Sequence, residues 1–124
     1  MKVLREDDIT QCDVDNTLVI WPKDPHIKRP GTIAFNYGDE IIYLFPHTPH
    51  IRFLKHCFNR GNFTSVWSQN GWAWAEQVVR KLNLVKFVDE VRGKPTRHID
   101  DKNTIEDLAG NRIFMTYIPE GMNE

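Results

Sequence analysis

The sequence predicts an α/β fold, with a parallel Rossmann-like sheet in three layers and helices on both faces. One observation is that short runs of β-branched and aromatic residues alternate with segments of helical periodicity. Another is that the residues suited to chemistry follow predicted strands, as ligand-binding residues do in parallel sheets. A chain of 124 residues, of which 40% are hydrophobic, can bury one core, so we expect a single domain over residues 1–124.

The first half of the chain predicts one strand, a hairpin and a helix. Residues 9–12 are β-prone and form the first predicted strand. Two further β-prone runs flank a short turn that contains Gly38, which is the signal of a hairpin. Thr48 followed by Pro49 predicts the start of a helix, because Thr is a favoured N-cap and Pro a favoured first helical residue. This helix is expected to end at Gly61. The hairpin strands are expected at residues 32–35 and 41–45.

The second half alternates strands with helices. Residues 63–67 are β-prone, and a helix is expected over 72–82, where apolar residues form one stripe. The remaining predicted elements are strands at 85–91, 97–99 and 112–117 and a short helix at 104–109. Such alternation favours a parallel sheet. In that sheet Asp13, Ser68 and Asp100 would all follow the carboxyl ends of strands.

Composition excludes several classes of protein. The chain has 16 Lys and Arg against 17 Asp and Glu, so strong non-specific binding to nucleic acid is not expected. No apolar run approaches the ~20 residues of a membrane span, and the charged N-terminus lacks the apolar region of a signal peptide. Cys12 and Cys57 are too few for a disulfide framework. We therefore expect a cytoplasmic protein with no membrane partner.

Asp13 and Asp15 form the most informative local pattern. In extended backbone, two residues apart, their side chains lie on the same side of the chain. Two ionised carboxylates repel each other, so a site that holds both needs a cation, and Mg²⁺ prefers oxygen ligands. Alternatively, one carboxylate holds a proton and serves as an acid. An EF-hand loop is excluded, because Leu18 and Asp24 stand where that loop needs Gly and Glu.

A polar turn after the strand at 63–67 is the second pattern. Ser68, Gln69 and Asn70 lie between that strand and the following helix. Hydroxyl and backbone N–H groups at the start of a helix suit a phosphate group. The plainer interpretation is that Ser68 caps the helix and has no further role.

Lys94 and the adjacent carboxylates of Asp100 and Asp101 are the third and fourth patterns. Taken alone, a lysine on a loop is a solvated charge. Adjacent carboxylates repel each other unless a metal ion or a lysine compensates them. A solvated turn that includes Lys102 is the plainer interpretation of this acidic pair.

In this order the four patterns resemble the haloacid dehalogenase-like (HAD) phosphohydrolase superfamily, over about residues 9–117. The resemblance implies phosphoryl transfer through an aspartyl-phosphate, with Mg²⁺ as cofactor. It implies Asp13 as nucleophile, Asp15 as general acid and base, and Thr17 as a brace for the loop. The implied phosphate contacts are Ser68, Gln69, Asn70 and Lys94. The implied metal ligands are Asp13, Asp15 through its backbone carbonyl, and one or both of Asp100 and Asp101. The resemblance implies that the four patterns, far apart in sequence, gather around this one ion.

The sequence departs from this pattern at two places. Thr10 and Gln11 are polar for a buried central strand. Lys94 and Asp100 are close in sequence, and the predicted strand between them carries Arg97 and His98. These departures weaken the alignment of Lys94 and the fourth strand more than that of Asp13.

Only about residues 19–47 are available for a cover over the site, which is a small β-hairpin flap and no large cap domain. The open site resembles superfamily members that act on bulky substrates. We therefore expect a phosphorylated partner, either a small molecule or a polymer end, with a nucleotide or nucleic-acid end preferred. A catalytically inactive HAD-fold module that binds phosphate or regulates is the alternative. A nucleic-acid-binding protein that uses Trp72 and Trp74 is a third hypothesis.

Histidines gather near the first predicted helix. His47, His50, His56 and Cys57 lie within eleven residues, so a zinc site is conceivable. Their spacing is not compact, because His50 and His56 are six residues apart and do not share a helix face. The sequence therefore leaves the role of these histidines open.

Overall fold

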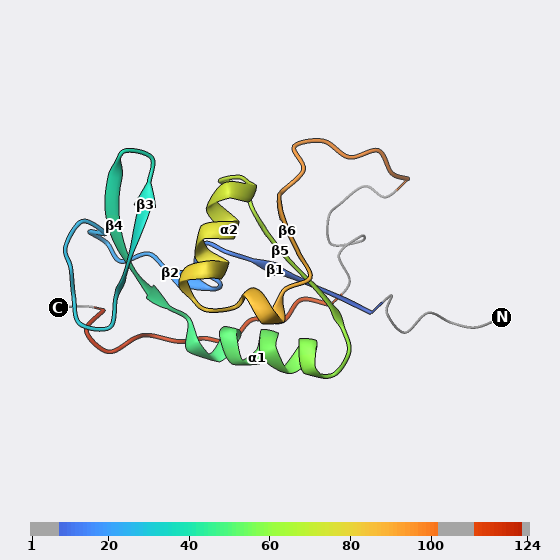
Figure 1. Cartoon of the computed structure of the whole chain (residues 1–124), viewed down its shortest axis with the longest axis horizontal. Helices are drawn as coiled ribbons and strands as arrows, with labels where there is room; N and C mark the ends of the chain where they lie inside the picture. The colour runs from blue at the N-terminus through green and yellow to red at the C-terminus, as the bar shows by residue number, and fades with distance from the viewer. Residues whose placement is uncertain (1–7, 102–110, 123–124) are drawn as a thin grey trace.

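The computed structural model describes residues 8–101 and 111–122, and Figure 1 shows their arrangement. This part of the chain is α/β, with a three-stranded parallel sheet, a three-stranded antiparallel sheet and two α-helices. The strands are β1 (Ile9–Asp13), β2 (Val19–Ile20), β3 (Ile33–Tyr37), β4 (Glu40–Pro46), β5 (Phe63–Ser68) and β6 (Glu90–Gly93). The helices are α1 (Thr48–Asn59), α2 (Trp72–Lys81) and a short 3-10 helix, η2 (Val85–Phe87). None of the described helices has the length and apolar character needed to cross a bilayer.

The parallel sheet brings the ends of three strands to one edge. β5 is its middle strand, with β1 on one side and β6 on the other. In this register Asp13 lies opposite Trp67, and Ser68 lies opposite Gly93. Three of the four predicted patterns therefore meet at the carboxyl ends of β1, β5 and β6, where parallel sheets bind their ligands.

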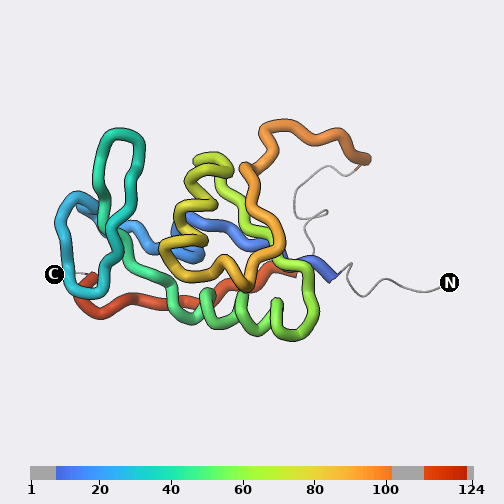
Figure 2. The backbone as a smooth tube through the Cα atoms, in the orientation of Figure 1, coloured from blue at the N-terminus to red at the C-terminus, as the bar shows by residue number. Residues whose placement is uncertain are grey.

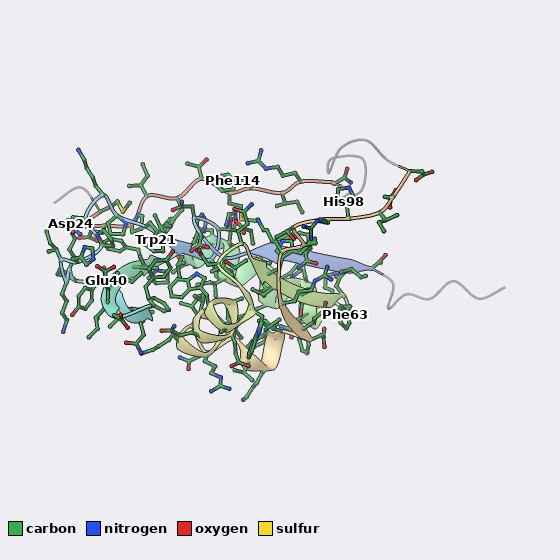
Figure 3. The ribbon with its side chains drawn as sticks, turned by 90° about the horizontal axis from the view of Figure 1, so that it is seen from above. Trp21, Asp24, Glu40, Phe63, His98 and Phe114 are labelled. Atoms are coloured by element: carbon green, nitrogen blue, oxygen red, sulfur yellow. The ribbon has the colours of Figure 1, made fainter. Side chains whose placement is uncertain are left out.

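The two faces of the parallel sheet differ in polarity. Residues that lie opposite each other on β1, β5 and β6 point to the same face of the sheet, and the next set along the strands points to the other face. One such row lies in or against the hydrophobic core, and the next row is polar. The core row is Cys12, Val66 and Val91, and the polar row is Gln11, Ser65 and Glu90. Leu54 of α1 and Val78 of α2 belong to the same core, so both helices pack on the apolar face. Figure 3 shows α2 on one side of β1 and Phe114, in the segment 111–122, on the other.

The three-layer arrangement with helices on both faces stays a prediction. Within residues 8–101 and 111–122, neither helix lies against the polar row of the sheet. The short helix predicted at 104–109 lies outside the described residues.

The predicted hairpin is confirmed, and it is docked on α2. β3 and β4 pair in antiparallel fashion, and Gly38, with φ of 62°, allows the turn between them. The Gln77 side chain of α2 then bonds the backbone of Asn36 twice. Its Oε1 accepts the Asn36 N–H at 2.7 Å, and its Nε2 donates to the Asn36 carbonyl at 2.9 Å. Phe35 packs edge-on against Trp74 at 5.6 Å, so the flap is part of the core.

Both main helices lie where the sequence predicts them, with one different cap. α1 is capped by His47, whose side chain accepts the N–H of His50, so the predicted Thr48 cap is wrong. The imidazole reaches this N–H because it projects from the residue before the helix. α2 follows Gly71, whose φ of 96° favours glycine, and no side chain caps it.

Two predicted strands in the middle of the chain need correction. The segment 85–91 begins as the 3-10 helix η2, and the strand is limited to Glu90–Gly93. Asp89 lies just before β6, and its carboxylate accepts the N–H of Thr64 at 2.9 Å. Residues 97–99 form no strand, and Ile99 is fully exposed. Backbone N–H and C=O groups that are exposed to water are already hydrogen-bonded by it, so this segment does not need to pair with β6.

The last predicted strand also needs correction. Residues 112–117 are extended but join no sheet. Met115 has its N–H and its carbonyl bound by imidazole rings of His50 and His47, at 2.7 and 2.9 Å. The side chains of His47 and His50, at the start of α1, therefore bind the backbone that a neighbouring strand would otherwise pair with.

We predict that Gln77→Ala lowers the free energy of unfolding by about 1 kcal/mol, because two hydrogen bonds to the edge of β3 are lost. Urea unfolding of the purified protein measures the change. Glu76→Ala is the matched control, since its exposed ion pair with Arg80 is expected to contribute less than about 0.5 kcal/mol. Equal effects of the two substitutions would contradict the docking of the hairpin through Gln77.

Candidate functional site

Asp13 and Lys94 form an ion pair at the carboxyl edge of the parallel sheet. The Lys94 Nζ lies 2.9 Å from Asp13 Oδ1, and Thr17 Oγ1 donates to Asp13 Oδ2 at 3.1 Å. Lys94 is held there because its backbone N–H donates to the Ser68 carbonyl at 2.9 Å, directly after β6. The side chains of Lys94 and Asp13 are 27% and 35% exposed, so an anion from solvent can reach both.

The loop after β1 folds tightly around one carbonyl oxygen. The carbonyl of Val14 accepts N–H groups from Thr17, Leu18 and Val19 at 3.2, 2.8 and 3.2 Å. Asn16 adopts a positive φ of 59°, which asparagine tolerates better than most residues. Val14 and Leu18 are fully buried. The loop is thus fixed by its own backbone and by the core.

The Asp15 carboxylate accepts four hydrogen bonds from other segments. Its Oδ1 accepts the indole N–H groups of Trp21 and Trp74 at 2.9 and 3.0 Å. Its Oδ2 accepts from the Ser68 hydroxyl and the Asn70 side-chain amide, both at 3.1 Å. A carboxylate offers about four lone-pair sites, so this side chain is fully used within the protein. Asp15 therefore ties the flap, the end of β5 and α2 to the loop after β1.

The predicted phosphate turn is only partly exposed. Ser68 is fully buried, and its hydroxyl donates to Asp15 and accepts the backbone N–H of Asn70 at 3.0 Å. Gln69 and Asn70 are exposed, and Tyr37 donates to the Asn70 side chain at 3.2 Å. In this arrangement the Ser68 hydroxyl organises the turn, while Gln69 and Asn70 are the polar side chains that face solvent.

The described residues do not gather the expected metal ligands around one point. Asp13 ends β1 and Asp15 lies in the loop that follows, but Asp100 and Asp101 lie in the segment 94–101, which Figure 2 shows leading away from the sheet. Within residues 8–101 and 111–122, no group of three His, Cys, Asp or Glu side chains could hold a metal ion. Lys94 compensates the charge of Asp13, and the four donors occupy the Asp15 side chain but not its backbone carbonyl. Binding of Mg²⁺ therefore stays a prediction.

Cys12 is not a competing nucleophile. Burial, and then the negative charge of Asp13, raises the pKa of the Cys12 thiol to about 12. The thiolate is the reactive form of cysteine, and at neutral pH it is nearly absent here. Of the two neighbouring side chains Cys12 and Asp13, only Asp13 is therefore available as a charged group at this edge.

Sequence patterns missed the aromatic residues around the two carboxylates. Trp74 lies in the core and Trp72 is 59% exposed, as their spacing predicts, but the indole N–H of Trp74 also binds Asp15. Trp67 lies beside Asp13 in the register, with Arg92 at 5.1 Å and Lys94 at 5.9 Å from its ring. Side-chain alternation along β5 could have placed Trp67 on this face, but nothing in the periodicity identifies hydrogen-bond donors.

The surface around Asp13 is open. Two hollows in the described surface lie at the other end of β5, one beside His56, Cys57 and Arg60 and one beside Gly61 and Phe63. Their linings do not include the Asp13 and Lys94 pair. Asp13 and Lys94 are nevertheless partly exposed to solvent.

Comparison of the chain with protein-family models, curated proteins and solved structures gives no match. The HAD resemblance therefore stays a prediction that rests on the order of the four sequence patterns. Any conclusion about function has to come from the chemistry of the side chains at the carboxyl edge of the sheet.

We predict that Trp74→Phe lowers the free energy of unfolding by about 1–2 kcal/mol, because a donor to the Asp15 carboxylate is lost. Phenylalanine keeps an aromatic ring in the core, so much of the packing remains. Thermal or urea unfolding measures the change. Trp72→Phe is the control: this exposed ring is not part of the Asp15 network, and a change within about 0.5 kcal/mol is expected. The same loss in both variants would refute the role of the indole N–H.

Proposed function

We propose that this chain is a phosphomonoester hydrolase of the HAD type that transfers a phosphoryl group to Asp13. The observation that carries the proposal is the exposed Asp13–Lys94 ion pair at the carboxyl edge of a parallel sheet. An ionised carboxylate can attack phosphorus without a base to activate it. The ammonium group of Lys94 offsets the repulsion between this carboxylate and the anionic phosphate.

The proposed reaction has two steps. An Asp13 oxygen forms a bond to phosphorus, the bond from phosphorus to the leaving oxygen breaks, and that oxygen takes a proton. Water then attacks the aspartyl-phosphate, loses a proton, and restores the Asp13 carboxylate with release of phosphate. Asp15 is the neighbouring carboxylate that can give and take these protons. To do so it must exchange one of its four hydrogen bonds, and the exposed amide of Asn70 is the donor best placed to give way.

Mg²⁺ belongs to the proposal through the HAD resemblance, but no step above depends on it. A metal requirement would oblige Asp100 or Asp101 to lie next to Asp13, in contrast to the arrangement described. Completion of the three-layer fold belongs to the same proposal. A cytoplasmic location is also part of it.

The surroundings of Asp13 favour a substrate with an aromatic base. Trp67 offers a half-buried ring beside Asp13, and Arg92 and Lys94 lie over it. An aromatic ring can stack on a base while cations contact phosphate groups. We therefore propose a nucleotide or nucleic-acid end as the substrate, reached across the open edge of the sheet.

A second candidate function is binding of phosphate without turnover. The observation that favours it is that Asp15 is saturated by four protein donors. The position of Asp100 and Asp101 away from the Asp13 loop favours it as well. A module of this kind would bind phosphate at Lys94 and release none from an ester.

A phosphatase screen separates the two functions. Nucleotides, 3′-phosphorylated oligonucleotides, sugar phosphates and phosphopeptides are each incubated with the protein, once with Mg²⁺ and once with EDTA. Release of phosphate from at least one ester is expected, and comparison of the two conditions decides the metal requirement. Phosphate binding with no release from any ester under either condition would support the binding module instead.

We predict that Asp13→Asn abolishes turnover and leaves the fold intact, because the amide is not a nucleophile for phosphorus. Phosphate release is the measurement, and circular dichroism checks the fold. Asp39→Asn, in the exposed turn of the hairpin, is the matched control and should keep the wild-type rate. A near-wild-type rate in Asp13→Asn would rule out Asp13 as the nucleophile.

We predict that Lys94→Ala removes about 2–4 kcal/mol of transition-state stabilisation, as does the loss of one donor to a developing oxyanion. The ratio of kcat/KM between wild type and variant measures this quantity. Lys81→Ala, an exposed lysine at the end of α2, is the control with an unchanged rate. If Lys94→Ala kept the full rate, Lys102 would be the next lysine to test.

A further inference from the structure

His47 and His50 stack face to face at the start of α1. Their ring centroids are 3.7 Å apart, the ring planes differ by 5°, and the residues are 2% and 6% exposed. The proposed reaction uses neither ring. Phe114 lies 5.1 Å from His50, and Tyr117 lies 5.3 Å from His47, so aromatic residues of the segment 111–122 flank the stack. Buried imidazoles in such surroundings need hydrogen-bond partners at both nitrogens.

All four ring nitrogens have backbone partners. For His50, the Met115 N–H donates to Nε2 at 2.7 Å, and Nδ1 lies 2.8 Å from the Thr17 carbonyl. For His47, the His50 N–H donates to Nδ1 at 3.2 Å, and Nε2 lies 2.9 Å from the Met115 carbonyl. Amides only donate and carbonyls only accept, so this network assigns the tautomers. His50 carries its proton on Nδ1, His47 carries it on Nε2, and both rings are neutral.

The pair connects the candidate nucleophile to the C-terminal segment. His50 holds the carbonyl of Thr17, and the Thr17 hydroxyl donates to the Asp13 carboxylate at 3.1 Å. On the other side, the two rings hold both backbone groups of Met115. Figure 2 shows the segment 111–122, in red, running beside α1. One pair of side chains thus fixes two segments that lie far apart in the sequence.

A proton added to either ring would break one of these bonds. A proton on His50 Nε2 would face the Met115 N–H, and a proton on His47 Nδ1 would face the N–H of His50. Two imidazolium rings 3.7 Å apart would also repel each other. Burial, and next the neighbouring His50, lowers the pKa of His47. The neutral forms are therefore the ones that the fold favours.

Among residues 8–101 and 111–122, no carboxylate pairs with either ring. The two rings face each other at the start of α1, and His50 faces the Thr17 carbonyl with Asp13 beyond it. The segment 111–122 carries three titratable or charged groups: the Tyr117 phenol beside His47, Arg112 over Phe114, and the exposed Glu120.

We propose that His50 is a positioning residue for Asp13, and that His47 and His50 form a clasp that holds residues 111–122 only while both rings are neutral. The evidence for the clasp is its hydrogen bonds and does not depend on the proposed function. The effect of His50 on turnover does depend on the proposed function. Because His47 binds protons more weakly in the folded protein, stability is full above the ordinary histidine pKa of about 6.5 and falls as the pH drops below it.

The first experiment needs no substrate. ¹⁵N NMR of the histidine side chains at pH 7.5 should show two neutral rings with opposite tautomers, His47 protonated at Nε2 and His50 at Nδ1. The protection factor of the Met115 amide, its exchange rate relative to that of an unstructured peptide at the same pH, should be high at pH 7.5 and should fall as the pH drops below about 6. Equal tautomers, a charged ring at pH 7.5, or unchanged protection of Met115 in acid would overturn the clasp.

The second experiment compares three variants. His50→Ala loses every ring contact, whereas the amide of His50→Asn can still donate to the Thr17 carbonyl but no longer accepts the Met115 N–H. We expect kcat to fall about tenfold to hundredfold in His50→Ala with KM nearly unchanged, and to recover in His50→Asn. Exchange of the Met115 amide should accelerate in both. His56→Ala, a histidine at the end of α1, is the control without effect on either quantity.

These outcomes separate the two proposals. Absence of phosphatase activity in the wild type would refute the proposed function, while the tautomers and Met115 exchange would still decide the clasp. Equal kcat in wild type and His50→Ala would refute the positioning role of His50. If His50→Ala does not fold, a kcat of His50→Asn as low as one hundredth of wild type would refute that role as well.

Discussion

Saturation of the Asp15 carboxylate by four neutral donors is the constraint on which the site depends. The donors come from the flap, the end of β5 and α2, so one side chain fixes these segments relative to the loop after β1. Asp13 stands on the same loop, and its direction follows from that anchoring. Removal of the carboxylate would leave buried donors without partners, which costs more than the bonds themselves contribute.

The structure compensates two neighbouring carboxylates in two different ways. Asp13 has the ammonium group of Lys94 at 2.9 Å, and Asp15 has hydrogen bonds from neutral groups. For this pair the sequence alone left a metal ion and a protonated carboxylate as alternatives, and the described residues place Lys94 beside Asp13. The two carboxylates therefore differ in their surroundings. Asp13 is partly exposed beside Lys94, whereas Asp15 organises the segments around it and, in the proposed reaction, must exchange one of its hydrogen bonds to transfer a proton.

The sequence was sufficient where burial alone determines structure. The hairpin, α1, β5 and α2 follow from periodicity and turn residues, and the meeting of Asp13, Ser68 and Lys94 follows from the parallel sheet. Hydrophobic periodicity predicts which side chains are buried. It does not predict the hydrogen bonds that the polar atoms of those side chains form. The indole N–H of Trp74 and the imidazoles of the clasp were therefore missed. Residues 112–117 have the alternation of a strand, yet side chains of α1 take the place of a neighbouring strand.

Trapping of the phosphorylated protein is the most direct test of Asp13 as the nucleophile. An acid quench during turnover of a phosphate ester, followed by peptide mass spectrometry, locates any phosphoryl group on the chain. We expect one phosphoryl group on Asp13, labile to hydroxylamine as an acyl phosphate is, and none in Asp13→Asn. Steady release of phosphate with the group on another residue, or with no phosphorylated protein at any quench time, would contradict the account.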